Sequence, residues 1–339
     1  MKKLIVKGLA AALLVLSPAL AHADTIRMLV WPGYADDDWI AEFEKATGDS
    51  VEVVFASTDD EIWSKIRGSG GADFDLVSVN TAELRRYIDA GLAVPLDLAK
   101  IPNQQKALPQ FRDLGSIAAV TKDGKVYGVP LAYDSIGLIY DKDKVKEAPD
   151  SWSVLWDPAY KGKVLDYNAS SHNFSVAAMT MGYKPFNLSD DEMGKVRDKL
   201  KDLRKNVLTF YSQPDEAMSI YQNNDIALIF ANYGHQQLRQ MQKAGANVGY
   251  VVPKEGALAW LDTFMITSGA KSPDAAYKWV NFILDPKRSA QLSERQGFGN
   301  TMTPMSGQAD SDKGELQWLL PVENFTKRTD MWNEVMAGQ

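Results

Sequence analysis

The sequence predicts a two-lobed α/β protein with doubly wound sheets. Removing an expected leader of 23 residues from the 339 leaves 316, which is too many for one small core and suits two lobes of about 100 to 200 residues each. Apolar, strand-like segments alternate with amphipathic, helix-like ones from residue 25 onward, a pattern typical of parallel strands joined by helices. A second α/β segment begins near Ser151, in the middle of the chain.

The individual elements follow from local patterns. The expected strands cover residues 25–30, 51–55, 75–79, 136–140, 164–167, 226–230 and 256–266. The expected helices cover residues 36–47, 59–66, 82–90, 174–181, 190–206, 215–222, 273–284 and 287–296. The first of these helices places Trp39, Ile40 and Phe43 on one face and ends at Gly48. The helix at 190–206 mixes acids and bases, which is typical of a solvated face.

The first 23 residues have the pattern of a secretory signal peptide. Lysines at positions 2, 3 and 7 precede the apolar run 9–16, and Ala21-His22-Ala23 is a small-residue cleavage site. We therefore expect cleavage after Ala23 and a periplasmic protein. No later run reaches the roughly 20 apolar residues that a membrane-spanning helix needs.

Charge and composition exclude several classes of function. Losing the three leader lysines from 37 basic residues leaves 34 against 44 acidic ones, a net charge of −10, which argues against nucleic acid as a partner. The chain has no cysteine, so thiolate metal sites and thiol nucleophiles are impossible. His172 and His235 are the only histidines after the leader, so we expect no metal and no cofactor.

Several aromatic and polar residues stand where expected strands end. Trp31 and Tyr34 flank Pro-Gly at the end of the first strand, an edge at which ligands collect in α/β sheets. These two rings could instead be ordinary core aromatics, but Pro-Gly favours a loop and therefore a site. Asn80 and Thr81 end the third strand, where capping of the next helix is the simpler role.

Later strand ends repeat this arrangement. Polar or aromatic residues follow the expected strands at Asn168, in the turn 168–173, and at Asn232, and Phe298 stands in a glycine turn. Tyr133 and Asp134 place another ring beside another carboxylate.

The segment 256–266 carries the most informative residue. Asp262 interrupts an apolar strand, and alternation along the strand puts its side chain on the same face as Trp260. An indole beside a carboxylate can bind a cation. The alternative is that Asp262 pairs with an internal arginine or lysine, because buried charges are usually paired.

Motifs of hydrolytic and nucleotide-dependent enzymes are absent from the sequence. It contains no Gly-x-Ser-x-Gly elbow, His-Glu-x-x-His pair, P-loop or dinucleotide-binding fingerprint. His235 is expected to be a surface histidine. Aromatic rings with hydroxyl, amide or acid groups at strand ends indicate a cleft that binds without reacting, so we do not expect an enzyme. A periplasmic hydrolase or lyase using Asp134 and Asp262 is the alternative.

Over most of its length the sequence resembles the periplasmic binding proteins of spermidine/putrescine-type ABC importers. The segments that carry the resemblance are Trp31-Pro32-Gly33-Tyr34, Phe74-Asp75-Leu76-Val77, Ser151-Trp152, Leu155-Trp156-Asp157-Pro158-Ala159-Tyr160-Lys161-Gly162, Pro253-Lys254-Glu255-Gly256 and Trp260-Leu261-Asp262. The resemblance implies a type II periplasmic binding fold with mixed doubly wound sheets and two hinge crossings, near Tyr133 and Ala259. Its lobes would be 24–132 with 259–339, including the C-terminal helices, and 133–258.

The resemblance also implies roles for particular residues. The matching aromatics, which would sandwich a methylene chain, are Trp31, Tyr34, Phe230, Trp260 and Phe298. Asp262 matches the acid that takes an ammonium group, and Asn80 and Thr81 match small polar contacts.

This chain departs from the polyamine-binding pattern in two places. It has no acid in 168–172, and Pro32 and Gly33 replace acidic residues that some members carry. One amine anchor is clearly retained, and Asp134 is the candidate for a second. We therefore expect a monomeric receptor that binds a polyamine or a related amino compound, such as 4-aminobutyrate or an opine, and delivers it to a membrane permease. A receptor for a sugar or an anion, with Asp262 paired internally, is a further alternative.

Overall fold

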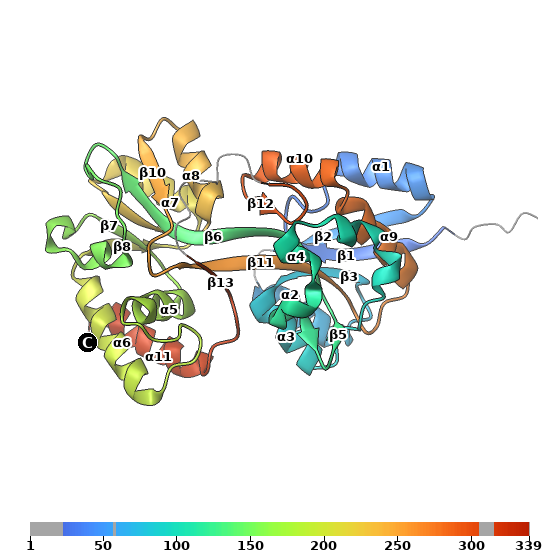
Figure 1. Ribbon diagram of the computed structural model, residues 1–339, viewed down its shortest axis with the longest axis horizontal. Coiled ribbons are helices and arrows are strands. Elements are labelled where there is room, and N and C mark those ends of the chain that lie inside the picture. The colour runs from blue at the N-terminus through green and yellow to red at the C-terminus, as the bar shows by residue number, and fades with distance from the viewer. Residues whose placement is uncertain (1–22, 57–58, 305–314, 339) are drawn as a thin grey trace, which may run out of the picture.

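The computed structural model describes residues 23–56, 59–304 and 315–338, which form two lobes joined side by side (Figure 1). Of the expected signal peptide, only Ala23 lies among these residues. Within the described ranges, no helix has both the length and the apolar character needed to cross a membrane. The predicted α/β fold class is confirmed, because one mixed sheet with helices on both faces runs through both lobes.

Lobe 1 contains the N-terminal strands and a later return of the chain. Its strands are β1 (Thr25–Val30), β2 (Ser50–Phe55), β3 (Leu76–Asn80), β4 (Thr121–Lys122), β5 (Lys125–Val126) and β12 (Gly299–Asn300), with parts of β6 (Val129–Asp141) and β11 (Ala257–Ile266). Its helices are α1 (Asp37–Thr47), α2 (Asp59–Ser69), α3 (Thr81–Asp89), α4 (Pro109–Arg112), α9 (Pro273–Ile283) and α10 (Pro286–Gln296). The sheet order is β2-β1-β3-β11-β6, with β1 parallel to both neighbours and β11 antiparallel to β3 and β6.

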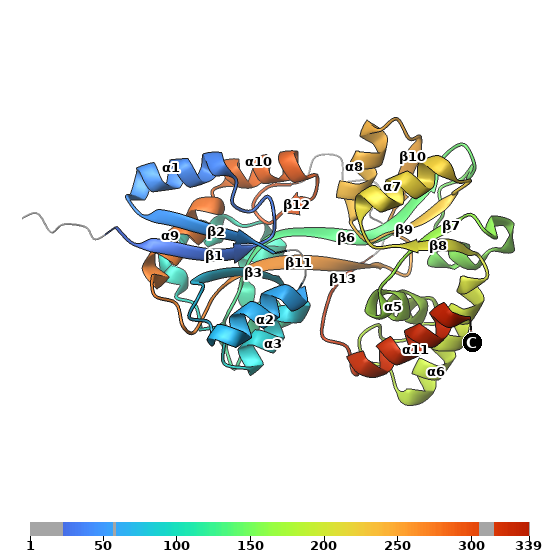
Figure 2. The same ribbon diagram turned by 180° about the vertical axis from the view of Figure 1, so that it is seen from behind.

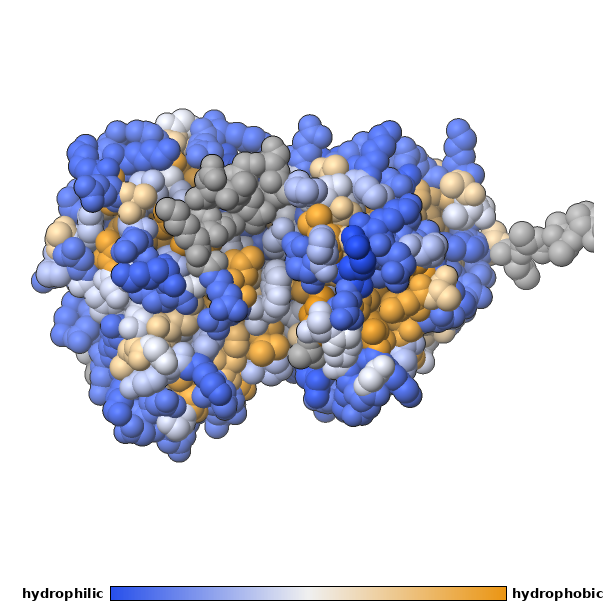
Figure 3. All heavy atoms as spheres, viewed as in Figure 1, coloured by the Kyte–Doolittle hydropathy of each residue, from blue (hydrophilic) through white to orange (hydrophobic). Residues whose placement is uncertain are grey.

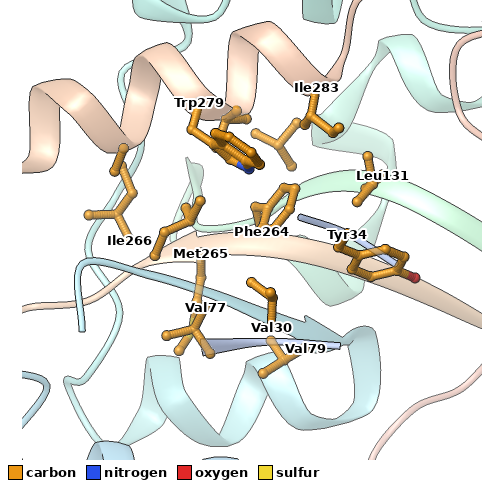
Figure 4. Packing of buried hydrophobic residues seen from close by; sticks show 14 of the residues in the cluster. Val30, Tyr34, Val77, Val79, Leu131, Phe264, Met265, Ile266, Trp279 and Ile283 are labelled. Atoms are coloured by element: carbon orange, nitrogen blue, oxygen red, sulfur yellow. The ribbon is translucent and has the colours of Figure 1, made fainter. Parts of the chain in front are cut away.

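The lobe 1 core lies between this sheet and the helices on its two faces. In Figures 1 and 2, α1, α9 and α10 cover one face, and α2 and α3 cover the other. Trp279 of α9 packs edge-on against Phe43 of α1, with 5.1 Å between ring centroids. Tyr34 adds its ring to the same core, and Figure 4 shows its hydroxyl oxygen directed away from the packed side chains.

Lobe 2 continues the sheet in the order β6-β9-β7-β8, with β10 also paired to β6. Its further elements are β7 (Val164–Tyr167), β8 (Val207–Tyr211), β9 (Leu228–Ala231), β10 (Val248–Val251), α5 (Ser170–Thr180), α6 (Asp190–Arg204), α7 (Pro214–Asn223) and α8 (Gly234–Lys243). Alternate residues of its strands enter two hydrophobic clusters: Leu138 belongs to one and Ile139 to the other. The sheet of lobe 2 is therefore covered on both faces.

Two long strands pass from one lobe to the other. β6 pairs with β11 at Tyr133 and Ile136, and then with β9 from Gly137 to Tyr140. β11 runs beside it in the opposite direction, and both strands connect the lobes in Figure 1. The positions expected for the hinge crossings, Tyr133 and Ala259, lie within these two strands.

The C-terminal segment departs from the expected division into lobes. β13 (Leu316–Trp318) pairs with the start of β11, and α11 (Phe325–Ala337) then packs against α5 and α6 of lobe 2 (Figure 2). Trp332 and Val335 of α11 are buried in a lobe 2 cluster. The segment 259–339 is therefore shared between the lobes, and the chain passes between them a third time.

Candidate functional site

A cleft of about 1540 Å³ opens between the lobes. Seven of the twelve candidate residues line it: Trp31, Tyr34, Asn80, Asn232, Trp260, Asp262 and Phe298. They come from the turn after β1, the end of β3, the turn after β9, strand β11 and the turn after α10. Hydrophobic residues reach the surface near the middle of the molecule and on lobe 1 beside it, whereas hydrophilic residues dominate the outer ends (Figure 3).

Asp262 stands in β11 opposite Asn80 of β3, next to a break in register with β6. Its side chain lines the cleft, yet the residue is only 9% exposed. The Tyr34 hydroxyl donates a hydrogen bond of 2.6 Å to its Oδ2. Among the residues that the structure describes, no arginine or lysine forms an ion pair with Asp262, so the alternative of an internal salt bridge is not supported.

Burial controls the ionisation of this pair. Removal from water raises the pKa of Asp262 to about 7, although the hydrogen bond from Tyr34 acts in the opposite direction. Burial, reinforced by the neighbouring carboxylate, raises the pKa of Tyr34 well above its usual range, so Tyr34 stays a hydrogen-bond donor. A cation arriving beside Asp262 would favour the ionised carboxylate, because opposite charge lowers the pKa of an acid.

Aromatic rings form the wall around Asp262. Phe298 packs edge-on against both Trp260, at 5.2 Å between centroids, and Tyr34, at 6.1 Å. Trp31 and Trp260 are only partly buried, so their rings remain accessible from the cleft. Such rings attract cations through their negative faces and pack against methylene groups.

Asn80 has the capping role expected of it and a second contact as well. Its side-chain oxygen accepts hydrogen bonds from the backbone amides of Ala82 and Glu83 at the start of α3. Its amide nitrogen lies 3.3 Å from each carboxylate oxygen of Asp59, which also lines the cleft. Asn80 therefore holds a second carboxylate of lobe 1, that of Asp59, at the cleft that Asp262 also lines.

Lobe 2 contributes a wall of rings and amides. The His172 ring stacks on Tyr167, with 5.9 Å between centroids, and its Nδ1 lies 2.8 Å from Oδ1 of Asn232. Because that oxygen can only accept, Nδ1 carries the proton and Nε2 is an acceptor. Burial lowers the pKa of His172 to about 4, so the ring is neutral near pH 7. Tyr233 completes this wall.

Four of the candidate residues lie outside the cleft lining because they hold the fold together. The Thr81 hydroxyl donates to the carbonyl of Leu319, and the Tyr133 ring packs between Phe111 and Trp318. Asn168 accepts a hydrogen bond from the Trp332 indole of α11. Phe230 is buried against Trp152, with 5.3 Å between ring centroids.

Asp134, the expected second anchor, is also outside the lining. It is fully buried, and its carboxylate accepts hydrogen bonds from the backbone amide and the ring Nδ1 of His235, both at 2.8 Å. His235 is 7% exposed, so the expectation of a surface histidine was wrong. Asp134 therefore fastens α8 to β6, and it does not form a carboxylate pair with Asp262 in the cleft.

Comparison with known proteins identifies the family. Residues 38–316 match the profile of the bacterial extracellular solute-binding proteins. The chain belongs to this family. It is 29% identical to the putrescine-binding periplasmic protein of Escherichia coli (strain K12), over 94% of this chain and 93% of the relative. It is 27% identical to the spermidine/putrescine-binding periplasmic protein of the same organism, over 97% and 93%.

Solved structures show the same fold. The spermidine/putrescine ABC transporter substrate-binding protein of Streptococcus pneumoniae superposes with a TM-score of 0.79 at 21% identity, covering 93% of this chain and 99% of that one. The two-lobed architecture expected for this solute-binding protein is therefore confirmed.

Sequence reasoning missed several residues of the cleft. Asp59, Tyr167 and His172 line it, but Asp59 begins an expected helix, and only Asn168 was chosen from the expected strand end and turn that contain Tyr167 and His172. Helix α8 was also missed, although Gln236, Arg239, Gln240 and Lys243 line the cleft from it. Their spacing of three and four residues is helical, and recognising that period in 234–243 would have found them.

Proposed function

We propose that this solute-binding protein is the periplasmic receptor of an ABC importer and that it captures a small amine-bearing solute. The observation that carries the proposal is the Asp262 carboxylate, which faces the cleft with Tyr34 as its hydrogen-bond partner and aromatic rings around it. The names of the curated relatives, which bind putrescine or spermidine, support the same class of solute.

Capture follows from the chemistry of this wall. An ammonium group donates charge-assisted hydrogen bonds to Asp262, each contributing about 1.5 to 3 kcal/mol. Trp260 and Phe298 add cation–π and apolar contacts, which contribute roughly 0.5 to 2 kcal/mol for each ring that meets the cation. The Tyr34 hydroxyl orients the carboxylate, because its hydrogen bond fixes Oδ2.

Closure of the lobes completes the site. Pockets for small molecules commonly enclose roughly 300 to 1,000 Å³, so a cleft of about 1540 Å³ is too wide to surround a small amine on all sides. A solute that contacts both lobes favours a narrower, closed arrangement through these additional contacts. The closed receptor then delivers its solute to a membrane permease. It acts as a monomer, and export removes residues 1–23 by cleavage after Ala23.

Calorimetric titration with putrescine, spermidine and 4-aminobutyrate tests this proposal. Wild-type protein should bind at least one of them, and Asp262→Asn should lower that affinity about a hundredfold, because the ammonium loses its counter-charge. Asn keeps an oxygen acceptor for Tyr34, so the fold should be retained.

A matched control exists in Asp166. This residue of β7 is also buried, and burial also raises its pKa to about 7, but it does not line the cleft. Asp166→Asn should therefore bind like the wild type. Unchanged affinity in Asp262→Asn, or equal losses in the two variants, would remove Asp262 from the site.

A further inference from the structure

The two walls of the cleft carry opposite charge. From lobe 1, the charged residues of the lining are Asp59, Asp262, Glu294 and Arg295. From lobe 2, they are Asp215, Arg239 and Lys243. Counted as formal charges, the first wall is negative and the second is positive. The field across the cleft therefore favours a solute with a positive group at one end and a negative group at the other.

Arg239 and Lys243 are the basic residues of the positive wall, and of these two only Arg239 has a planar guanidinium that can bind a carboxylate with two parallel hydrogen bonds. Within the part of the chain that the structure describes, it forms no hydrogen bond, ion pair or ring contact. Arg295, on the opposite wall, is held by Asp36 and Asp38. Asp215, the acid on the Arg239 side, instead accepts a hydrogen bond from Gln240. Arg239 therefore offers guanidinium N–H groups to a ligand in the cleft.

Contact with lobe 1 places Arg239 near the aromatic wall. The Cβ that Gly297 lacks would lie 3.3 Å from Cδ of Arg239 and 3.4 Å from Cα of Gln236. Gly297 has a φ of +90°, so glycine satisfies both the backbone and this close approach of α8. Phe298, which packs on Trp260 and Tyr34, is the next residue. The stem of Arg239 therefore reaches the rim of the same ring cluster that surrounds Asp262.

We propose that Arg239 binds a carboxylate of the solute, so that the ligand is a zwitterionic amino compound, such as an ω-amino acid or an N-substituted amino acid, and not a diamine. This inference rests on the proposed function, in which Asp262 binds the amine. The planar guanidinium matches a carboxylate with two parallel hydrogen bonds. The second ammonium of a diamine would instead lie in the field of Arg239 and Lys243, which is repulsive.

Matched ligands and a charge-removing variant test the inference. By calorimetry, 4-aminobutyrate should bind more tightly than putrescine, and 5-aminopentanoate more tightly than cadaverine. Arg239→Gln should weaken binding of the two amino acids by about tenfold to a hundredfold, because charge-assisted hydrogen bonds are lost. Arg239→Gln should bind the diamines as tightly as the wild-type protein does, or more tightly. Arg239→Lys should recover part of the loss. Lys205→Gln, which removes one positive charge outside the cleft, should change neither.

The outcomes separate this inference from the proposed function. If the diamines bind more tightly than the amino acids, or if Arg239→Gln weakens both classes equally, the carboxylate anchor is wrong. If Asp262→Asn still weakens binding of those diamines, the proposed amine receptor stands. If neither these four compounds nor spermidine binds to the wild-type protein, the amine receptor and the carboxylate anchor are both overturned.

Discussion

At the residue scale, Asp262 and Asp134 show how two acids of neighbouring strands acquire different roles. Asp262 faces the cleft and accepts a hydrogen bond from Tyr34, whereas Asp134 is enclosed by the start of α8. Both are nearly or fully buried, so burial alone does not distinguish them. The number of hydrogen-bond donors distinguishes them, because Asp134 accepts hydrogen bonds from the backbone amides of Ser135 and His235 and from the His235 ring. A carboxylate with few internal donors can accept others from a ligand.

The raised pKa of Asp262 predicts a pH-dependent affinity. In the free protein the carboxyl group holds a proton below about pH 7, and an ammonium ligand must displace it. Affinity for the amine should therefore fall about tenfold for each pH unit below 7 and level off above it. Calorimetry from pH 5 to 8 in buffers of different ionisation enthalpy would measure both the affinity and the released proton.

Asp262→Asn is the control for this titration, because any residual affinity should no longer change between pH 5 and 8. His172 does not add to the effect, since its pKa of about 4 lies below the measured window. An affinity of the wild type that is constant from pH 5 to 8 would contradict the assignment.

Local geometry made part of this site predictable. Strand alternation placed Trp260 and Asp262 on one face, and the Pro-Gly turn placed Trp31 and Tyr34 at a strand end. The pairing of Asp134 with His235, 101 residues apart, leaves no local signal. The partners of an acid in the folded chain decide its role, and a single sequence does not specify them.

At the scale of elements, the contact between β6 and the start of α8 determines the position of the lobe 2 side of the cleft. Gly234 begins α8 with a φ of +52°, and a Cβ there would lie 2.4 Å from the carbonyl oxygen of Ser135. The helix start therefore sits directly on β6, fastened by Asp134. Because α8 carries Gln236 and Arg239, this junction also positions the groups that face lobe 1.

Asp134→Asn should destabilise the protein. An amide supplies one oxygen where the carboxylate supplied two, so at least one buried N–H of Ser135 or His235 loses its acceptor. We expect the free energy of unfolding to fall by about 1 to 3 kcal/mol, measured by urea denaturation at pH 8.

Asp262→Asn, in contrast to Asp134→Asn, is not expected to lower the free energy of unfolding at pH 8. Because the folded state raises the pKa of Asp262, its stabilising contribution is complete below the unfolded pKa of about 4 and is lost as pH rises through 7. At pH 8 this variant should be at least as stable as the wild type. Equal effects of the two substitutions on stability would contradict the roles assigned to them.

The elements themselves were predicted unevenly. The strand at 25–30 coincides with β1, and the charged helix predicted at 190–206 is α6. Helix α8 was missed because its residues are mostly polar, and only Leu238 and Met241 of this helix pack against the hydrophobic cluster of lobe 2. The position of α8 depends on its contacts with β6, and contacts between segments far apart in the chain cannot be predicted from the sequence pattern of one segment.

At the scale of the whole molecule, β6 and β11 provide the connection about which the lobes can move. Their central residues pair with each other, so a bend there changes the angle between the lobes while each core is preserved. Gln236 and Arg239 of lobe 2 lie close to the Gly297 turn of lobe 1, so the lobes approach each other at this edge of the cleft.

Ligand binding should make the molecule more compact. Small-angle X-ray scattering of the wild type, saturated with whichever amine binds in calorimetry, should give a smaller radius of gyration than the free protein. Asp262→Asn at the same ligand concentration should scatter like the free protein. An unchanged radius in the saturated wild type would mean that the cleft binds without closing.

The path of the last residues has a consequence for how the polypeptide becomes functional. Lobe 1 needs β11, α9 and α10, and lobe 2 needs Trp332 and Val335 of α11 to fill its interior. Neither half is therefore an uninterrupted stretch of chain, and neither can be cut out as a working fragment. During biosynthesis, the early strands of lobe 1 must wait for the chain to be made as far as Met302, and lobe 2 must wait for Val335, so neither half can complete its interior until most of the polypeptide has been made.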